Sequence, residues 1–138
     1  DMGYSHVIPE LIKKMLNNKK ISIVSANHKR AFCYIDDAVE QIIKLSFSKL
    51  IKKETFNIGN PNEEITIFNL AKKIQYNLKR EISLKKDKKI TVGSPERRVP
   101  SLSKFKKYFG KTEFTILNEG LRKTIAWYCS DLKKNRKV

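Results

Sequence analysis

The stretch from Lys29 to Ile43 constrains the fold more than any other part of the chain. It begins with a basic pair, continues through a β-prone patch over residues 32–35, and reaches the acidic pair Asp36-Asp37. Apolar residues then recur at helical spacing, at Val39, Ile42, Ile43 and Phe47. An acidic pair ahead of such a run predicts a helix start, because carboxylates cap free N–H groups and stabilise the positive end of the helix dipole. The stretch therefore predicts a strand, an acidic turn and a helix in succession.

Periodicity elsewhere predicts several further helices and short strands, and so an α/β fold or an α+β fragment. Helical spacing marks 5–18, 66–78, 102–109 and the segment after 115, and β-branched alternation marks 21–24, 55–59, 82–84 and 90–92. Thr66 and Thr115 precede two of these helices and are of a residue type that caps helix N-termini. Gly110 follows a third and is typical of a helix end. Residues 1–138 are expected to form one unit with a frayed basic tail at 133–138.

Composition excludes several classes of protein. Apolar residues make up 40% of the 138, enough for a core, and no apolar run approaches the roughly 20 residues that span a membrane. Residues 1–4 lack the basic-then-apolar pattern of a signal peptide, so a cytoplasmic location is expected. Cys33 and Cys129 are then expected to be reduced. With two histidines and no Cys-x-x-Cys, no metal site is predicted, and His28 is interpreted as polar surface.

The net charge of +16 leaves two interpretations open. Such a charge attracts polyanions, including nucleic acids and acidic membranes. The lysines are, however, spread along the chain as pairs and short runs rather than gathered in one segment. The sequence contains neither an aromatic RNA-binding signature nor a helix-turn-helix pattern. Solvated helix faces and loops are therefore the favoured interpretation, and nucleic acid is not an expected partner.

Five segments of the chain, taken in order, resemble one enzyme family. They are Val7–Ile12, Arg30–Glu40, Thr55–Pro61, Arg97–Lys104 and Leu117–Tyr128. Together they resemble the C-terminal portion of the extended short-chain dehydrogenase/reductases, which are the NAD-dependent nucleotide-sugar epimerases, dehydratases and decarboxylases. The resemblance implies that the chain is the substrate-binding C-terminal lobe of such an enzyme, without the N-terminal Rossmann part.

Two motifs that the family uses for catalysis are absent from this sequence. Its five glycines form no Gly-x-Gly-x-x-Gly or Gly-x-x-Gly-x-x-Gly turn, the element that holds the NAD pyrophosphate at a helix N-terminus. None of its five tyrosines is followed four residues later by lysine, as in the family's catalytic Tyr-x-x-x-Lys pair. No catalytic or cofactor-binding residue is therefore predicted. NAD is expected in the complete enzyme and is not expected to bind this segment alone.

The resemblance implies that arginines bind the substrate. Arg30 and Arg98 match family arginines that contact the diphosphate of the nucleotide sugar, and Arg97 flanks the second of them. A guanidinium suits this role because its planar fork matches phosphate oxygens and stays charged at every working pH. The alternative is that these arginines are ordinary surface cations. Ser101 stands where the family has an acidic residue.

The resemblance also implies where the nucleotide base would lie. In the family, backbone at the positions of Val7 and Ile8 faces the base, and an aromatic residue at the position of Val24 stacks on it. An aliphatic side chain covers a base but cannot stack on it as a ring does. The turn over 25–29 also lacks the glycines usual in the family.

The sequence thus favours a nucleotide-sugar substrate-binding part, of UDP- or dTDP-sugar type, of an NAD-dependent epimerase, dehydratase or decarboxylase. The expected partners are the nucleotide sugar, the N-terminal Rossmann portion or its chain, and in the complete enzyme a second copy. Surface at Val39, Ile43, Phe56 and Ile58 would then lack its usual cover in this chain. The alternative is a non-catalytic basic binding module, or a truncated fragment, that binds a polyanion or a partner protein.

Overall fold

Two small sheets with helices at both ends make up the structure, a computed structural model that describes residues 6–135, with side chains to residue 131. The helices are α1 (Val7–Asn17), α2 (Ile35–Ser46), α3 (Ile67–Leu78), α4 (Ser103–Phe109) and α5 (Leu117–Asn135). The strands are β1 (Lys20–Ile23), β2 (Lys29–Ala31), β3 (Glu64–Thr66), β4 (Ser83–Lys86) and β5 (Arg97–Arg98). This confirms the predicted α/β class with several helices and short strands.

Strand β2 is the centre of the arrangement. It pairs antiparallel with β3 on one side and parallel with β5 on the other, while β1 and β4 form a separate parallel pair. In the β2–β5 register Arg30 lies opposite Arg98, and Lys29 lies opposite Arg97. Because side chains alternate between the two faces of a strand, Arg30 and Arg98 share one face and Arg97 lies on the other.

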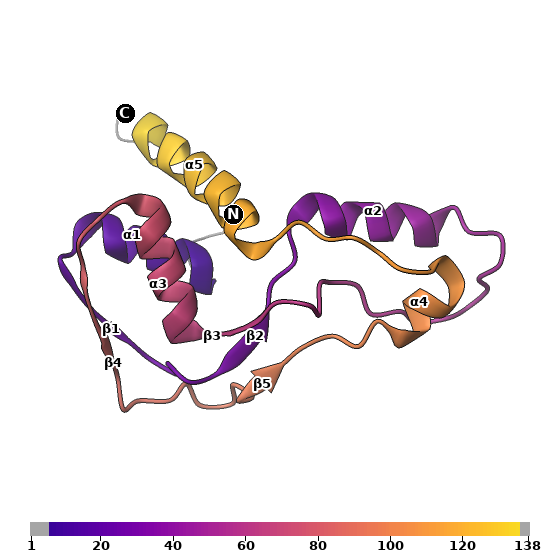
Figure 1. Ribbon diagram of the computed structural model, residues 1–138, viewed down its shortest axis with the longest axis horizontal. Coiled ribbons are helices and arrows are strands. Elements are labelled where there is room, and N and C mark those ends of the chain that lie inside the picture. Colours follow the sequence, from indigo (N-terminus) through magenta and orange to yellow (C-terminus); the bar gives the residue numbers. More distant parts are fainter. Residues whose placement is uncertain (1–5, 136–138) are drawn as a thin grey trace.

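The hydrophobic core lies where α1, α3 and α5 meet beside the β1–β4 pair (Figure 1). Helix α3 packs on both other helices and buries Leu70 and Ile74 completely. Burying a side chain of this size contributes roughly 1.5–3 kcal/mol. Thr66 caps α3 as predicted, since its hydroxyl accepts a hydrogen bond from the Asn69 N–H at 3.2 Å. The helical spacing in these three segments therefore marks the faces that pack in the core.

Helices α2 and α4 lie at the opposite end of the molecule from this core (Figure 1). The apolar face of α2 is largely uncovered: Ile43 is 51% exposed and Phe47 82% exposed. Val39 and Ile58 are exposed too, as expected for a surface that lacks a cover in the chain itself. Phe56 differs from the expectation, since it is half-buried and its ring packs on Tyr108. The opposite face of α2 is fixed by Gln41, which is fully buried and exchanges hydrogen bonds with the backbone of Gly59.

Three predicted strands differ in the structure. The strand of the central stretch is β2, so the residues that follow it, 32–34, are irregular. Residues 55–59 form no strand, because in the part of the chain that the structure describes no neighbouring backbone pairs with them. Their position is set instead by side chains, such as Lys104, whose Nζ donates to the carbonyl of Thr55 at 2.9 Å. Residues 90–92 form a turn, in which the Ser94 N–H donates to the Thr91 carbonyl.

The acidic cap predicted for α2 is wrong, although the helix itself is confirmed. Tyr34 is at the N-cap and makes no side-chain cap. The carboxylate of Asp37 instead accepts hydrogen bonds from the N–H and the hydroxyl of Thr115, each at 2.9 Å. Thr115 is therefore a donor rather than the predicted cap of α5. The first N–H of that helix, at Leu117, donates to Glu63 at 2.7 Å.

Helix α5 is longer than expected. It continues to Asn135, so the first half of the predicted frayed tail is helical, and 136–138 lie outside the described residues. Trp127, on this helix, is 62% exposed. None of the helices in residues 6–135 is both long enough and apolar enough to cross a membrane.

Candidate functional site

A cavity of about 1160 Å³ lies along the face of β2 that carries Arg30. Its wall is formed by α1, the end of β1, β2, and the loops before α3 and after β5. Four of the six residues predicted to bind substrate line it, namely Val7, Val24, Arg30 and Arg98. The fold therefore brings together side chains that are far apart in the sequence.

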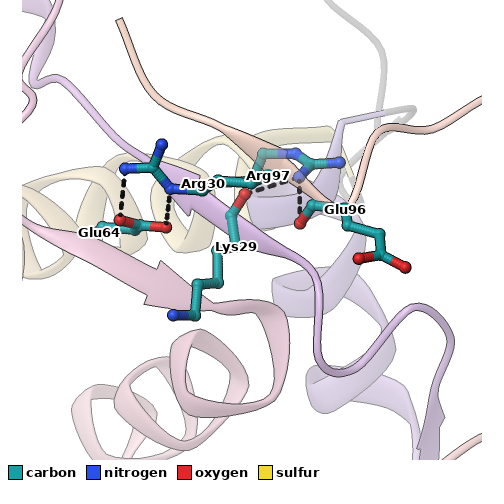
Figure 2. A network of polar contacts seen from close by, with 5 residues as sticks. All are labelled: Lys29, Arg30, Glu64, Glu96 and Arg97. Carbon is teal, nitrogen blue, oxygen red and sulfur yellow. Dashed lines mark hydrogen bonds and ion pairs between the residues drawn. The ribbon is translucent and has the colours of Figure 1, made fainter.

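Arg30 is held in place by its neighbours. Its Nη1 donates to the carbonyls of Lys29 at 2.7 Å and Glu96 at 3.4 Å (Figure 2). Its Nη2 donates to Ser94 Oγ at 2.8 Å. Partial burial and the nearby charge of Arg98 both lower the pKa of the Arg30 guanidinium. Each of these partners is neutral, so the positive charge of Arg30 is positioned but not neutralised.

Arg98 adds a second positive charge on the same face. Among the described residues its side chain has no ion pair and no hydrogen bond, and it is exposed to solvent. The carboxylate of Glu10 also lines the cavity, but it is paired with Lys14 one helical turn away. Two guanidinium groups in adjacent strands, with no carboxylate bound to either, form a site suited to an anion with several oxygens.

Arg97 lies elsewhere. Its Nε and Nη2 donate to the two carboxylate oxygens of Glu64 at 2.8 and 3.0 Å, on the face of the sheet opposite Arg30 (Figure 2). The hydrogen bond from Arg97 lowers the pKa of the Glu64 carboxyl, and Glu64 in turn raises the pKa of Arg97. Arg97 does not line the cavity; it ties β5 to β3 across the central strand.

The apolar candidates divide between two cavities. Val24, at the end of β1, is 40% exposed and forms part of the large cavity. Val7 lines both this cavity and a smaller apolar one of about 410 Å³ between α1, α5 and residues 32–35. Ile8 lines only the smaller cavity. Val7 and Val24 are thus the apolar candidates on the same cavity as the two arginines.

His28 is not the surface residue that the sequence suggested. It is 5% exposed, and both ring nitrogens are buried without a hydrogen-bond partner in the part of the chain that the structure describes. It lines the large cavity two residues before Arg30. The available signal was strand alternation, which puts His28 on the same side as Arg30. The contact of this turn with the start of α3, where the Ile67 N–H donates to the His28 carbonyl, joins segments far apart in the sequence.

The loop that carries Arg98 is held by the segment before β3. Asn57 Nδ2 donates to the carbonyl of Ser101 at 3.2 Å. Gly59, at φ +143°, approaches Pro100 so closely that a Cβ placed on Gly59 would lie 3.0 Å from the proline Cγ. The sequence predicted a strand over residues 55–59 and assigned none of them to the site. The structure shows that this segment sets the path of the chain just after Arg98.

Comparison with known proteins agrees with this fold. The family described as "NAD dependent epimerase/dehydratase family" matches residues 1–59. UDP-glucuronic acid decarboxylase 1 of Danio rerio is 30% identical over 133 residues, covering 96% of this chain and 31% of that protein. CDP-abequose synthase of Salmonella muenchen is 44% identical over 59 residues, covering 43% of this chain and 18% of that protein.

A solved structure matches over nearly the whole chain. The UDP-glucuronic acid 4-epimerase of Bacillus cereus, in complex with UDP-glucuronic acid and NAD, superposes with a TM-score of 0.81 at 22% identity. The match covers 92% of this chain and 40% of the epimerase chain. The chain spans about a third or less of the length of the two relatives named above. Sequence match and fold agree, and the chain belongs to the NAD-dependent epimerase/dehydratase family, the extended short-chain dehydrogenases.

Proposed function

We propose that the chain is the substrate-binding part of an NAD-dependent nucleotide-sugar epimerase, dehydratase or decarboxylase, and that Arg30 and Arg98 bind the substrate diphosphate. One observation carries the proposal. The two guanidinium groups lie opposite each other on one face of β2 and β5, line the same cavity, and have no carboxylate partner among the described residues.

The two arginines differ in a way that suits this role. Arg30 is already fixed by three hydrogen bonds, so little side-chain entropy is lost when it binds a phosphate oxygen. Arg98 is exposed and meets the ligand from the neighbouring strand. A hydrogen bond to a charged group contributes about 1.5–3 kcal/mol. Binding energy at the diphosphate would orient the sugar for a reaction carried out by other parts of the enzyme.

The nucleotide would lie toward α1 and the end of β1. Val7 and Val24 offer apolar contact there. Contact of this kind covers the flat face of a base without the ring stacking that an aromatic residue provides. A UDP- or dTDP-sugar is the substrate type we propose, with the base held less selectively than by a stacking ring.

NAD belongs to this proposal only for the whole enzyme. In residues 6–135 no helix N-terminus follows a glycine-rich turn, so these residues do not supply the usual cradle for a dinucleotide pyrophosphate. We place the Rossmann portion against the uncovered face of α2, where Ile43 and Phe47 are exposed. That portion would supply NAD and the catalytic groups, and a second copy of the complete enzyme would form a homodimer through it.

The test is a calorimetric titration of this chain with UDP-glucose, followed by NAD. The Arg98→Ala variant is expected to bind UDP-glucose roughly 10–100-fold more weakly. Arg30→Ala is expected to lose at least as much, because it also removes a preorganised group. Arg97→Ala is the matched control, since it removes an adjacent arginine from the opposite face. Equal affinity in the wild type and Arg98→Ala would refute the assignment.

A salt titration separates this proposal from the basic-module alternative. A general polyanion site would bind single-stranded oligonucleotides with an affinity that falls steeply as salt is added. Arg97→Ala and Arg98→Ala would then reduce this affinity equally. Selective loss with Arg30→Ala and Arg98→Ala would favour the diphosphate site.

A further inference from the structure

The buried imidazole of His28 has no explanation in packing alone. Among the described residues it is the side chain whose buried polar atoms, Nδ1 and Nε2, have no hydrogen-bond partner. A buried polar group without a partner destabilises a folded protein, and such groups are rare in native structures. An apolar residue of similar size would suit the same space better. His28 therefore weakens the ligand-free fold, as residues kept for binding often do.

Hydrogen bonds hold the backbone of His28 but not its ring. Its N–H donates to the Ser25 carbonyl at 2.9 Å, and its carbonyl accepts from the Ile67 N–H at 3.0 Å. The ring makes no hydrogen bond of its own. It lines the large cavity together with Arg30 and Arg98, and it also lines a smaller cavity of about 480 Å³ on its other side.

We propose that His28 is a third ligand-binding residue of the arginine cavity, and that it binds the ligand's phosphate as an imidazolium after taking one proton from solvent. The inference rests on the proposed diphosphate site and adds a residue that the family resemblance did not indicate. In the complex the ring turns toward the anion and donates to a phosphate oxygen, which removes its unmet hydrogen bond.

Charged groups lie on both sides of His28. On the large-cavity side they are Arg30 and Arg98, with the Glu10–Lys14 ion pair farther along α1. On the small-cavity side they are Lys86, Asp87, Lys88, Lys89 and Glu96. Asp87 is already engaged by Ser22 Oγ and the Lys89 N–H. The positive side chains among these groups outnumber the carboxylates, so a bound diphosphate would bring negative charge to a site that holds little of it.

The first part of the test measures proton uptake. UDP-glucose is titrated into the wild-type chain by calorimetry at pH 7.5, in two buffers with different ionisation enthalpies. The difference in apparent enthalpy gives the number of protons taken up. We expect an uptake approaching one proton per ligand, and an affinity that rises as the pH is lowered from 8 to 6. No uptake, together with a flat affinity profile, would overturn the inference.

The second part uses two variants with opposite expected effects on stability and binding. His28→Leu is expected to raise the melting temperature of the free chain by roughly 10 °C, because two unsatisfied nitrogens are removed. The same variant is expected to bind UDP-glucose roughly tenfold more weakly and without proton uptake. A purely structural histidine would not weaken binding while stabilising the fold. His28→Gln keeps a neutral donor and is expected to recover part of the affinity but none of the pH dependence.

The outcomes separate this inference from the function it rests on. If UDP-glucose binding needs Arg30 and Arg98 but is the same in His28→Leu as in the wild type, the diphosphate site stands and the role of His28 is refuted. If neither UDP-glucose nor inorganic pyrophosphate binds the wild-type chain, both are refuted. Pyrophosphate, which carries no base or sugar, shows whether the phosphate alone drives the proton uptake.

Discussion

Replacing Gln41 by methionine should destabilise the chain more than its single amide group suggests. Gln41 is fully buried in α2. Its Nε2 donates to the carbonyls of Asp37 at 3.0 Å and Gly59 at 3.2 Å, and its Oε1 accepts from the Gly59 N–H at 3.0 Å. Methionine has a similar length and no branching, so it should fill the space while removing these bonds.

The magnitude follows from the groups left behind. The Asp37 carbonyl lies in a helix, but the N–H and carbonyl of Gly59 are buried and would both lose their partner. An unsatisfied buried group costs about 1–3 kcal/mol, so two give a loss of roughly 2–6 kcal/mol. For 138 residues the entropy of unfolding is about 0.3 kcal/mol per kelvin, and a loss of 3 kcal/mol lowers the melting temperature by roughly 10 °C.

The assay is thermal and urea unfolding followed by circular dichroism, with Gln75→Met as the matched control. Gln75 is a half-buried glutamine in α3 whose Nε2 donates to one carbonyl, that of Ile82, at 3.0 Å. Its replacement should cost about 1 kcal/mol. Because Gly59 packs against Pro100, just after Arg98, Gln41→Met should also weaken UDP-glucose binding, whereas Gln75→Met should not. Equal destabilisation by the two variants would refute the reasoning.

Other perturbations give separate tests. Asp37→Ala removes both hydrogen bonds to Thr115 and should lower the free energy of unfolding, measured in urea, by about 2 kcal/mol. A loss under about 0.5 kcal/mol would show that this contact contributes little to stability. Burial and nearby Asp37 raise the pKa of the Cys33 thiol to about 11. The thiol therefore ionises at lower pH in the unfolded chain than in the folded one, and the free energy of unfolding should fall as the pH rises from about 9 to 11. Cys33→Ala should make this fall less steep, and an unchanged slope would show that Cys33 is not its cause. Ile43→Ser with Phe47→Ser should reduce binding of a hydrophobic dye to the α2 face; unchanged dye fluorescence would show that the face is covered.

Local patterns in the sequence were enough to place most helices. The apolar stripe of α3, the cap at Thr66 and the stop of α4 at Gly110 depend on residues within a few positions of each other. The stripe of α2 predicted the helix equally well, but the exposure of its apolar face was expected only from the family resemblance. An apolar stripe shows which face of a helix packs against another surface, but it does not show whether that surface is part of the same chain.

The parts of the fold that depend on distant pairing were harder to predict. Residues 55–59 have the composition of a strand, but a strand also needs a neighbour to pair with. The resemblance indicated Arg30 and Arg98 together with Arg97, and only the register of β5 on β2 separates the last from the first two. His28 was misjudged because its burial comes from segments far along the chain.

The N-terminal end of α5 is held by carboxylates from two earlier parts of the chain. Thr115 binds Asp37 across 78 residues of sequence, and Leu117 binds Glu63 across 54. Contacts that close loops of this length tend to form late, after the shorter-range helices have assembled. Changes at these carboxylates should therefore speed unfolding and leave the folding rate nearly unchanged. The lifetime of the folded chain would then depend on Asp37 in α2 and on Glu63 next to β3, although neither residue belongs to α5.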